Sequence, residues 1–356
     1  MLVAGFATRH VVQSAYRAGY EVYAIDHFCD QDLCWYTKEH TTYEELDELP
    51  DLITEWHRRY KTDALVVTSG AEDIHSDVPV QGSSPECATK FLDKLSIQHH
   101  FEDLGIPIPP VAEPREYPVM IKPCRGAGGW RNQIVHSEEE EAEWHELWPE
   151  VPSIRQKIIT GTPASVSCIS NGREARAIAV NMQILRGGEG DRAYGFGGDQ
   201  TPFDTSLGPE MVRYAEKAVA ASGCVGSVGV DFVINDHAWA IEINPRFQAT
   251  LDTVEMATGC HIFDLHLDAC KGRIPSLMPV PKQYAIREII FAEHDLVVRS
   301  NLKDLAPAIA DIPFVGTEIE EGGALLSAYG HGPTPEAARK MLDKTISGVS
   351  RYMTRW

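Results

Sequence analysis

The chain lacks any long hydrophobic run. Its 356 residues contain no apolar stretch approaching the roughly 18 residues that a membrane-spanning helix needs. The opening segment, MLVAGFATRH, meets a charged residue too early to supply the apolar core of a signal peptide. We therefore expect no membrane partner and a cytoplasmic location.

Paired cysteines are also missing. The eight cysteines, at positions 29, 34, 87, 124, 168, 224, 260 and 270, form no C-x-x-C motif, which is typical of reduced packing residues. Cys29 and Cys34 lie near His27 and His40 and can in principle hold a metal, but their spacing matches no standard zinc pattern.

Basic charge is scarce. Fifty-two acidic residues against thirty-two basic ones give a formal net charge of −20, which opposes nonspecific binding to nucleic acid or to an anionic membrane. A phosphate-bearing partner would therefore need a local cluster of positive charge. The hydrophobic share of 43% fits compact domains with ample cores.

The N-terminal segment predicts a small parallel α/β unit. Expected strands at 2–6, 20–26 and 64–70 alternate with helices at 7–19 and 43–60. The first loop lacks G-x-G-x-x-G, so a nicotinamide dinucleotide site is unsupported. Because ligands bind at the carboxyl ends of such strands, this unit is expected to form one wall of an acceptor site, with Arg9 as a candidate substrate contact.

The middle of the chain predicts a helix followed by short strands. Residues 84–105 are expected to be helical, and residues 118–136 to form two strands joined by a glycine-rich loop. An acidic surface helix is expected after Ser137. A hairpin with Asn171-Gly172 at its turn follows.

The segment 186–202 is expected to be a loop, because it holds six glycines in seventeen residues. Such a loop favours a mobile lid that closes over substrate and excludes water, with Arg186, Arg192 and Gln200 as candidate substrate contacts. A plain surface loop is the alternative. A strand and a helix of the C-terminal segment are expected to begin near residues 284 and 334.

Two carboxylates are expected to meet across a hairpin at 226–246. If its turn has two residues, Asp231 and Glu242 share one face, and in one register they lie directly opposite each other. A turn of odd length would separate them. Ala240, Ile241 and Ile243 are expected in the core.

Like charges on facing strands, with Cβ atoms about 5 Å apart, destabilise a sheet. A cation removes this cost, and Asp231, Glu242 and Asn244 supply the hard oxygen ligands that Mg²⁺ prefers. Arg246, two residues on, can reach a transferring phosphoryl group or a substrate carboxylate. The alternative is an exposed sheet face on which acids pair with Arg and Lys, and the spacing alone does not decide between the two.

A positive cluster is expected around Lys122. This lysine ends an expected strand just before the run PCRGAGG, where small residues let backbone N–H groups approach phosphate. The Walker A pattern G-x-x-x-x-G-K-[ST] is absent. Lys94, Arg125 and Arg131 complete the local cluster that an acidic protein would need.

Four motifs in this order resemble the ATP-grasp superfamily. They are Asp93-Lys94 heading a helix that ends in GIP, then VMIKP with its glycine loop, then GVDF, then EINPR eleven residues after the GVDF aspartate. The match spans about residues 85 to 275 and is nearest to the biotin carboxylase-like and predicted archaeal carboligase branches.

The resemblance implies an α/β fold, α+β in parts. It implies a Rossmann-like domain at 1–85, a lid subdomain with the glycine flap at 86–160, a large subdomain with the carboxylate hairpin at 161–279 and a C-terminal α/β tail at 280–356.

The resemblance also implies residue roles by position. Lys94 and Lys122 match the lysines that bind the ATP phosphates. The glycines of the flap over the phosphates correspond to Gly126, Gly128 and Gly129, and the adenine-reading segment corresponds to Gln156, Lys157 and Ile158. Asp231, Glu242 and Asn244 match the magnesium ligands, with Mn²⁺ as an alternative metal. Arg246 and Lys122 match the cations that act on the reacting phosphate. The ribose-binding acid has no match.

Members of this superfamily phosphorylate a carboxylate with ATP and then let an amine or a similar nucleophile displace phosphate. The resemblance therefore implies an ADP-forming carboxylate–amine or carboxylate–thiol ligase with small-molecule partners. The alternatives are a small-molecule kinase of the same fold and a nucleotide-binding regulatory protein without turnover. A homodimer is the default expectation for assembly.

Overall fold

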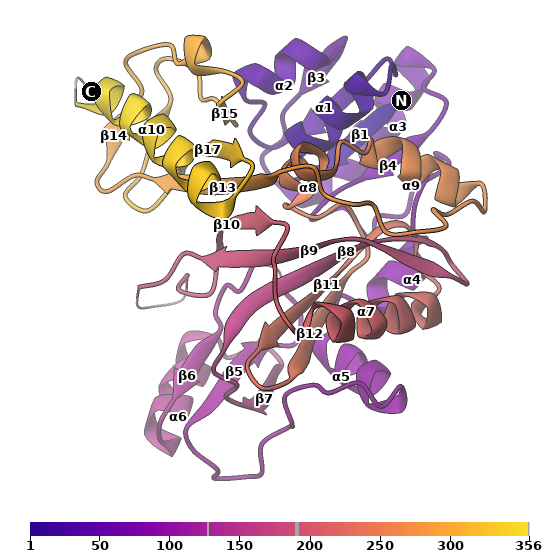
Figure 1. The fold of residues 1–356 in the computed structure, drawn as a ribbon, viewed down its shortest axis with the longest axis vertical. Coiled ribbons are helices and arrows are strands. Elements are labelled where there is room, and N and C mark those ends of the chain that lie inside the picture. Colours follow the sequence, from indigo (N-terminus) through magenta and orange to yellow (C-terminus); the bar gives the residue numbers. More distant parts are fainter. Residues whose placement is uncertain (127, 189–191, 355) are drawn as a thin grey trace.

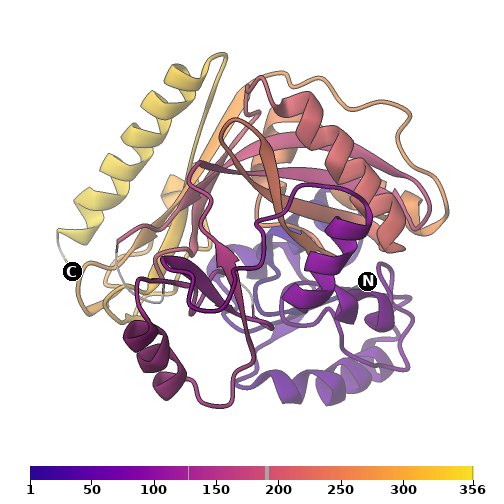
Figure 2. The same cartoon turned by 90° about the horizontal axis from the view of Figure 1, so that it is seen from below.

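The computed structural model describes residues 1–126, 128–188, 192–354 and 356. Figure 1 shows an N-terminal α/β unit above a long sheet, with a smaller sheet at the opposite end of the molecule. In the view from below, Figure 2, the C-terminal helix and the helix at 208–222 lie toward opposite ends of the long sheet.

The N-terminal unit is a four-stranded parallel sheet in the order β3-β2-β1-β4, which agrees with the sequence-based expectation. Its strands are β1 (Leu2–Gly5), β2 (Tyr23–Asp26), β3 (Glu39–Thr41) and β4 (Leu65–Val67). Its helices are α1 (Arg9–Arg17), α2 (Gln31–Tyr36), η1 (Leu46–Glu48) and α3 (Leu49–Tyr60). The carboxyl ends of β1, β2 and β4 therefore share one edge.

The segment expected as one helix at 84–105 is two helices, α4 (Pro85–Lys90) and α5 (Lys94–Asp103). The break falls where Asp93 caps α5 by accepting the backbone N–H of Ser96 at 2.9 Å. Lys94 is consequently the first residue of α5.

A three-stranded antiparallel sheet follows, in the order β6-β5-β7. Its strands are β5 (Val119–Pro123), β6 (Gln133–Val135) and β7 (Ser153–Lys157), and the acidic helix α6 (Glu138–Leu147) packs on it through the buried Trp144. The glycine-rich loop joins β5 to β6 as expected, although its Ala127 lies outside the described residues.

The long sheet has the order β12-β11-β8-β9-β10-β13-β17-β15. Its strands are β8 (Thr162–Asn171), β9 (Ala175–Leu185), β10 (Phe196–Thr201), β11 (Val225–Ile234), β12 (Ala238–Asn244), β13 (Tyr284–Phe291), β15 (Ile309–Ala310) and β17 (Ala324–Gly332). A small ribbon joins β14 (Leu296–Val297) to β16 (Glu318–Ile319), and η2 (Lys303–Leu305) lies between them in sequence. Strands β13, β15 and β17 thus continue the sheet past residue 280, and the domain boundaries given above stay a prediction.

Helices cover both faces of the long sheet. Helix α7 (Gly208–Ser222) packs on one face, whereas α8 (Leu251–Thr258) and α9 (Ile262–Cys270) lie between the other face and the N-terminal unit, as Figure 1 shows. The C-terminal helix α10 (Pro335–Met353) packs on β13 and β17. No helix among the described residues has both the length and the apolar character needed to cross a bilayer.

The β8–β9 hairpin forms with a turn shifted by one residue from the expected Asn171-Gly172. Ser170 pairs with Ala175, and the backbone N–H of Asn171 donates to the Glu174 oxygen at 3.1 Å, so the central pair begins at Gly172. Gly172 has φ 85°, a conformation that glycine adopts without strain.

The β11–β12 hairpin brings the two acids opposite each other by a different route from the expected one. Ile234 pairs with Ala238, so the turn has three residues, and this odd length alone would separate Asp231 from Glu242. A one-residue irregularity in the ladder restores their pairing. The turn expectation was wrong, and the pairing that followed from it is confirmed.

The irregularity also places Ile243, in place of Glu242, on the core face, and Ile241 lies outside the core. Ala240 and Ile243 are both buried although they are three positions apart, and the two residues between them, Ile241 and Glu242, are half-buried and line a cavity. The expectation that Ile241 is a core residue was therefore wrong. Its side chain and that of Glu242 belong to the same cavity wall.

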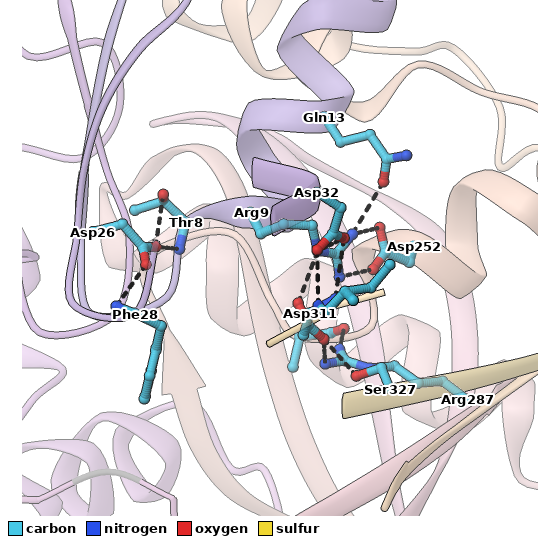
Figure 3. Close-up of polar contacts among 12 residues, drawn as sticks. Thr8, Arg9, Gln13, Asp26, Phe28, Asp32, Asp252, Arg287, Asp311 and Ser327 are labelled. Carbon is cyan, nitrogen blue, oxygen red and sulfur yellow. Dashed lines mark hydrogen bonds and ion pairs between the residues drawn. The ribbon is translucent and has the colours of Figure 1, made fainter. Parts of the chain in front are cut away.

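A buried ionic cluster joins three parts of the chain (Figure 3). Arg9 of α1 is 3% exposed and lies 2.6 Å from Asp252 of α8 and 2.8 Å from Asp311, which follows β15. Asp32 of α2 accepts the backbone N–H of Asp311 at 3.0 Å, and Arg287 of β13 lies 3.2 Å from the Asp311 carboxylate. The cluster therefore fixes the N-terminal unit against α8 and the C-terminal strands.

Replacing Arg9 tests this anchoring. Arg9→Ala leaves buried carboxylates unpaired, and we expect it to lower the free energy of unfolding by about 3 to 5 kcal/mol. Arg17→Ala on the same helix removes only a 4.0 Å ion pair of an arginine that is 44% exposed, and should cost less than about 1 kcal/mol. Denaturant unfolding of both variants makes the comparison, and equal losses would contradict the anchoring role.

Candidate active site

A cavity of about 380 Å³ lies between the small sheet and the β11–β12 hairpin. Much of its wall is apolar, from Met120 and Ile134 on the small sheet and Phe232 on the hairpin. The sequence-predicted residues that line it are Lys94, Lys122, Gly126, Gly129, Lys157, Ile158, Asp231 and Glu242. Lysine side chains line one side of this cavity, and the carboxylates of Asp231 and Glu242 line the other.

A second cavity of about 140 Å³ adjoins the first, because both are lined by Asp231 and Glu242. The predicted residues Gly128, Asn244 and Arg246 line this second cavity. The carboxylate pair therefore lies where a large, mainly apolar cavity meets a smaller one with a more polar wall.

The Asp231 carboxylate is held by amide donors. It accepts hydrogen bonds from Gln183 Nε2 at 2.9 Å and from Asn244 Nδ2 at 3.0 Å, while Glu242 lies opposite on β12. Burial, followed by the neighbouring Glu242 carboxylate, raises the pKa of Asp231 well above its ordinary value. Arg246 lowers the pKa of Asp231, but by less than burial and Glu242 raise it.

This arrangement suits a hard cation. Among the described residues no three His, Cys, Asp or Glu side chains gather as a metal-binding group. A metal here would therefore take the Asp231 and Glu242 carboxylates, the Asn244 amide oxygen and oxygens of a bound ligand, which is the donor set that Mg²⁺ accepts. The raised pKa of Asp231 indicates that the ionised carboxylate pair would be stabilised by additional positive charge.

Lys122 faces the carboxylates from β5 and is nearly buried, at 9% exposure. Its Nζ donates to Gln156 Oε1 at 2.8 Å, and Gln156 Nε2 donates to Gln98 Oε1 at 2.8 Å. Burial and the neighbouring Lys94 lower the pKa of Lys122 to about 8, while Glu242 acts to raise it. Gln156 thus orients a lysine and lines neither cavity, and its adenine-reading role stays a prediction.

Arg246 is oriented by a residue that sequence reasoning missed. Its Nε donates to Glu72 Oε1 at 2.7 Å, and one terminal nitrogen donates to Asn244 Oδ1 at 3.2 Å. Glu72 is 6% exposed and lies in the loop that follows β4. The N-terminal unit therefore contributes directly to the site, from the carboxyl end of a strand, which is where such sheets present ligand-binding residues.

Gln183 was also missed. It lies on β9, two strands from Asp231 in the sheet order, and points its amide at that carboxylate. The available signal was a polar residue in a mainly apolar strand run, AVNMQIL, which holds Asn181 as well as Gln183. The signal was ambiguous because neighbouring Asn181 is buried in a separate hydrogen-bonded network with Ser165 and Thr201.

Four proposed substrate contacts line neither cavity. Arg9 is held in the buried ionic cluster. Arg186 stacks on Phe291 with its guanidinium 4.4 Å from the ring centre, and a side chain at Gly322 would meet both Arg186 and Arg192. Gln200 lines a separate groove beside α10. Residues 189–191 of the expected lid lie outside the described residues.

Comparison with known proteins identifies the fold. Residues 91–250 match the model of the ATP-grasp domain. In sequence, the chain is 25% identical over 351 residues to an uncharacterized protein of Methanocaldococcus jannaschii, with 90% of this chain and 85% of that protein covered. It is also 23% identical over 256 residues to the large chain of carbamoyl phosphate synthase from Thermomicrobium roseum, of whose length it spans 23%.

Two solved structures share the architecture. One is the biotin carboxylase domain of 2-oxoglutarate carboxylase from Hydrogenobacter thermophilus, solved with MgADP, ADP and bicarbonate (TM-score 0.80, 14% identity, covering 97% of this chain and 89% of that chain). The other is phosphoribosylamine–glycine ligase from Thermotoga maritima (TM-score 0.73, 17% identity, covering 97% and 96%). Together with the domain match, these structures confirm the ATP-grasp fold.

Removing one of the paired charges tests the electrostatics of the site. Glu242→Gln eliminates the repulsion and offers Asp231 an amide donor. In metal-free buffer at about pH 8 we expect the variant to gain stability on the order of 1 kcal/mol, the equivalent of one pKa unit. The gain should shrink as the pH falls through the raised pKa of Asp231, because protonation then relieves the repulsion in the unchanged protein.

Thermal unfolding across a pH series measures this difference. Glu174→Gln, in the exposed β8–β9 turn, is the matched control and should show no such dependence. A Glu242→Gln variant that is less stable than the unchanged protein at pH 8, or a gain independent of pH, would contradict the account.

Proposed function

We propose that this chain, which carries an ATP-grasp domain over residues 91–250, is an ATP-dependent ligase that joins a small carboxylic acid to an amine. The observation that carries the proposal is the junction of the two cavities, where the Asp231–Glu242 pair meets Lys122 on one side and Arg246 on the other. That junction is the natural position for a phosphoryl group passing from one bound molecule to another.

The larger cavity is the proposed ATP site. Its apolar wall suits an adenine ring, and Lys94 and Lys122 suit the phosphates. The flap glycines let backbone N–H groups approach the phosphates closely, and Gly126, Gly128 and Gly129 all have positive φ, which other residues rarely adopt. A divalent metal held by Asp231, Glu242 and Asn244 would supply positive charge to the phosphate oxygens.

The smaller cavity is the proposed acid site. A carboxylate bound beside Arg246 attacks the γ-phosphorus of ATP through one oxygen, and the bond from that phosphorus to the bridging oxygen of ADP breaks. The products of this step are an acyl phosphate and ADP. Lys122 and Arg246 stabilise the charge that develops on the transferring group, so the protein needs no covalent nucleophile.

The amine completes the reaction. Its nitrogen attacks the acyl carbon, the bond from that carbon to the phosphate oxygen breaks, and inorganic phosphate leaves while the nitrogen loses a proton to solvent. Glu72 acts through Arg246, because it fixes the guanidinium that faces the acid. The same residues support a ligase acting on a thiol, and the choice of nucleophile lies with the rest of the acceptor site.

The reaction can be tested with hydroxylamine as a substitute amine. In the presence of Mg²⁺ and ATP, a panel of small carboxylic acids is expected to yield hydroxamate and ADP together for the correct acid, and ADP alone should not accumulate without both partners. Arg246→Gln should lower the rate by about a hundredfold or more, the usual cost of losing one charge-stabilising donor. Arg17→Gln, on exposed α1 surface, is the control.

Two outcomes would contradict the proposal. Formation of a stable phosphorylated product without hydroxamate would indicate a kinase of the same fold. Binding of ATP with no turnover by any acid, together with no effect of Glu242→Gln on that binding, would indicate a regulatory nucleotide-binding protein.

The pKa of Lys122 gives a second test. Phosphate binding favours the protonated lysine, whose pKa in the free protein is lowered to about 8. ATP affinity is therefore expected to fall as the pH rises through that value, by up to about tenfold per pH unit, since the deprotonated lysine must take up a proton to bind. Titration calorimetry measures the slope. Lys122→Met should bind more weakly with a flatter profile, and an unchanged profile in that variant would assign the slope to another group.

A further inference from the structure

Three aromatic rings gather at the carboxyl ends of β1 and β2. Phe6 directly follows β1, and His27 and Phe28 directly follow β2. The Phe6 and His27 rings stack with centroids 4.9 Å apart and planes 15° apart, and Phe28 meets both edge-on at 5.0 and 4.9 Å. Despite these contacts Phe6 is 42% exposed and Phe28 is 53% exposed. We call these three residues the aromatic platform.

The backbone that presents the platform is held rigidly. The Asp26 carboxylate accepts the backbone N–H groups of Thr8 at 2.5 Å, Phe28 at 2.8 Å and Cys29 at 2.7 Å. Cys29 adopts φ 50°, which is uncommon for a residue with a side chain and persists only where the surroundings enforce it. Figure 3 shows the Phe28 side chain extending away from the Asp26 carboxylate. An exposed ring on a fixed backbone loses little freedom on binding.

A short stretch of chain links the platform to the proposed acid site. The backbone N–H of Phe6 donates to the Ser69 oxygen at 2.7 Å, and a Cβ at Gly70 would lie 3.6 Å from the Phe6 Cβ. Glu72, in the same loop, reaches Arg246. Three peptide units separate Ser69 from Glu72, a chain length of at most about 11 Å. A small molecule can span that distance.

We propose that the aromatic platform binds a planar aromatic or heteroaromatic ring carried by the amine substrate. The inference rests on the proposed ligase function, because that function requires a second substrate whose nitrogen reaches the acyl group beside Arg246. Ligands of parallel sheets bind at the carboxyl ends of the strands, which is where the platform lies. An incoming ring can stack on or pack edge-on against rings already arranged at such angles.

A matched pair of amines tests the platform. Benzylamine and cyclohexylmethylamine carry their amino group on the same linker and differ in having an aromatic or a saturated ring. With the full-length protein and Mg-ATP, saturation-transfer NMR is expected to detect benzylamine more strongly. In the hydroxamate-positive system, the KM for benzylamine should be lower by about threefold to tenfold, which is the size of one aromatic pair contact.

Variants locate the effect. Phe28→Leu keeps an apolar side chain and removes the ring, so it should raise the KM for benzylamine toward that for cyclohexylmethylamine while leaving the KM for ATP unchanged. Phe6→Leu gives an independent second variant. Tyr16→Leu on α1, where the tyrosine is 52% exposed and thus matches Phe28, is the control and should change neither value.

The outcomes separate this inference from the ligase proposal. Ring-selective NMR binding that is lost in Phe28→Leu, without any ADP release, would support the platform and overturn the ligase function. If ADP release is the same with either amine and is unchanged in Phe6→Leu and Phe28→Leu, the platform inference is overturned and the ligase proposal stands. A change from dimer to monomer in Phe28→Leu would instead assign the exposed rings to a contact between two copies of the chain and overturn the inference.

Discussion

The site depends on two carboxylates that the backbone forces together. Asp231 and Glu242 face each other across the β11–β12 ladder and line both cavities, where burial limits the solvation of the Asp231 carboxylate by water. Such a pair is unfavourable by itself, so a protein that keeps it must offset the cost with a proton or a cation. The one-residue irregularity at Ile241 is what enforces the pairing, because the three-residue turn alone would have turned the acids to opposite faces.

The surrounding charges are arranged to complement that pair from separate parts of the chain. Lys122 comes from the small sheet, Arg246 follows β12, and Glu72 from the N-terminal unit fixes the arginine. The buried cluster around Arg9 then joins the N-terminal unit to α8 and to the C-terminal strands. The position of Arg246 beside the Asp231–Glu242 pair therefore depends on how these three parts pack, since Glu72, which orients Arg246, belongs to the N-terminal unit.

Much of this could be predicted from sequence because the signals are local. Alternating strands and helices predicted the N-terminal sheet, and the motifs around Lys122, Asp231 and Glu242 led to residues that do line the cavities.

The hairpin register could not be derived, because a bulge has no reliable sequence signature and one extra residue reverses the facing of every later side chain. That Arg186 and Arg192 line neither cavity was not predictable, since their glycine-rich sequence says nothing about where the loop packs. The groove that Gln200 lines was not predictable either, because a one-residue step along β10 decides which face of the sheet a side chain occupies. Glu72 and Gln183 reach the site from distant sequence positions, and only tertiary packing reveals them.

The most direct test of the central claim is a crystal structure with Mn²⁺ and a non-hydrolysable ATP analogue, in which the manganese is located by its anomalous scattering. The account predicts a peak bound by the carboxylates of Asp231 and Glu242, with the nucleotide phosphates reaching it from the side of Lys122. A metal bound elsewhere, or a nucleotide that leaves this carboxylate pair without a cation, would contradict it.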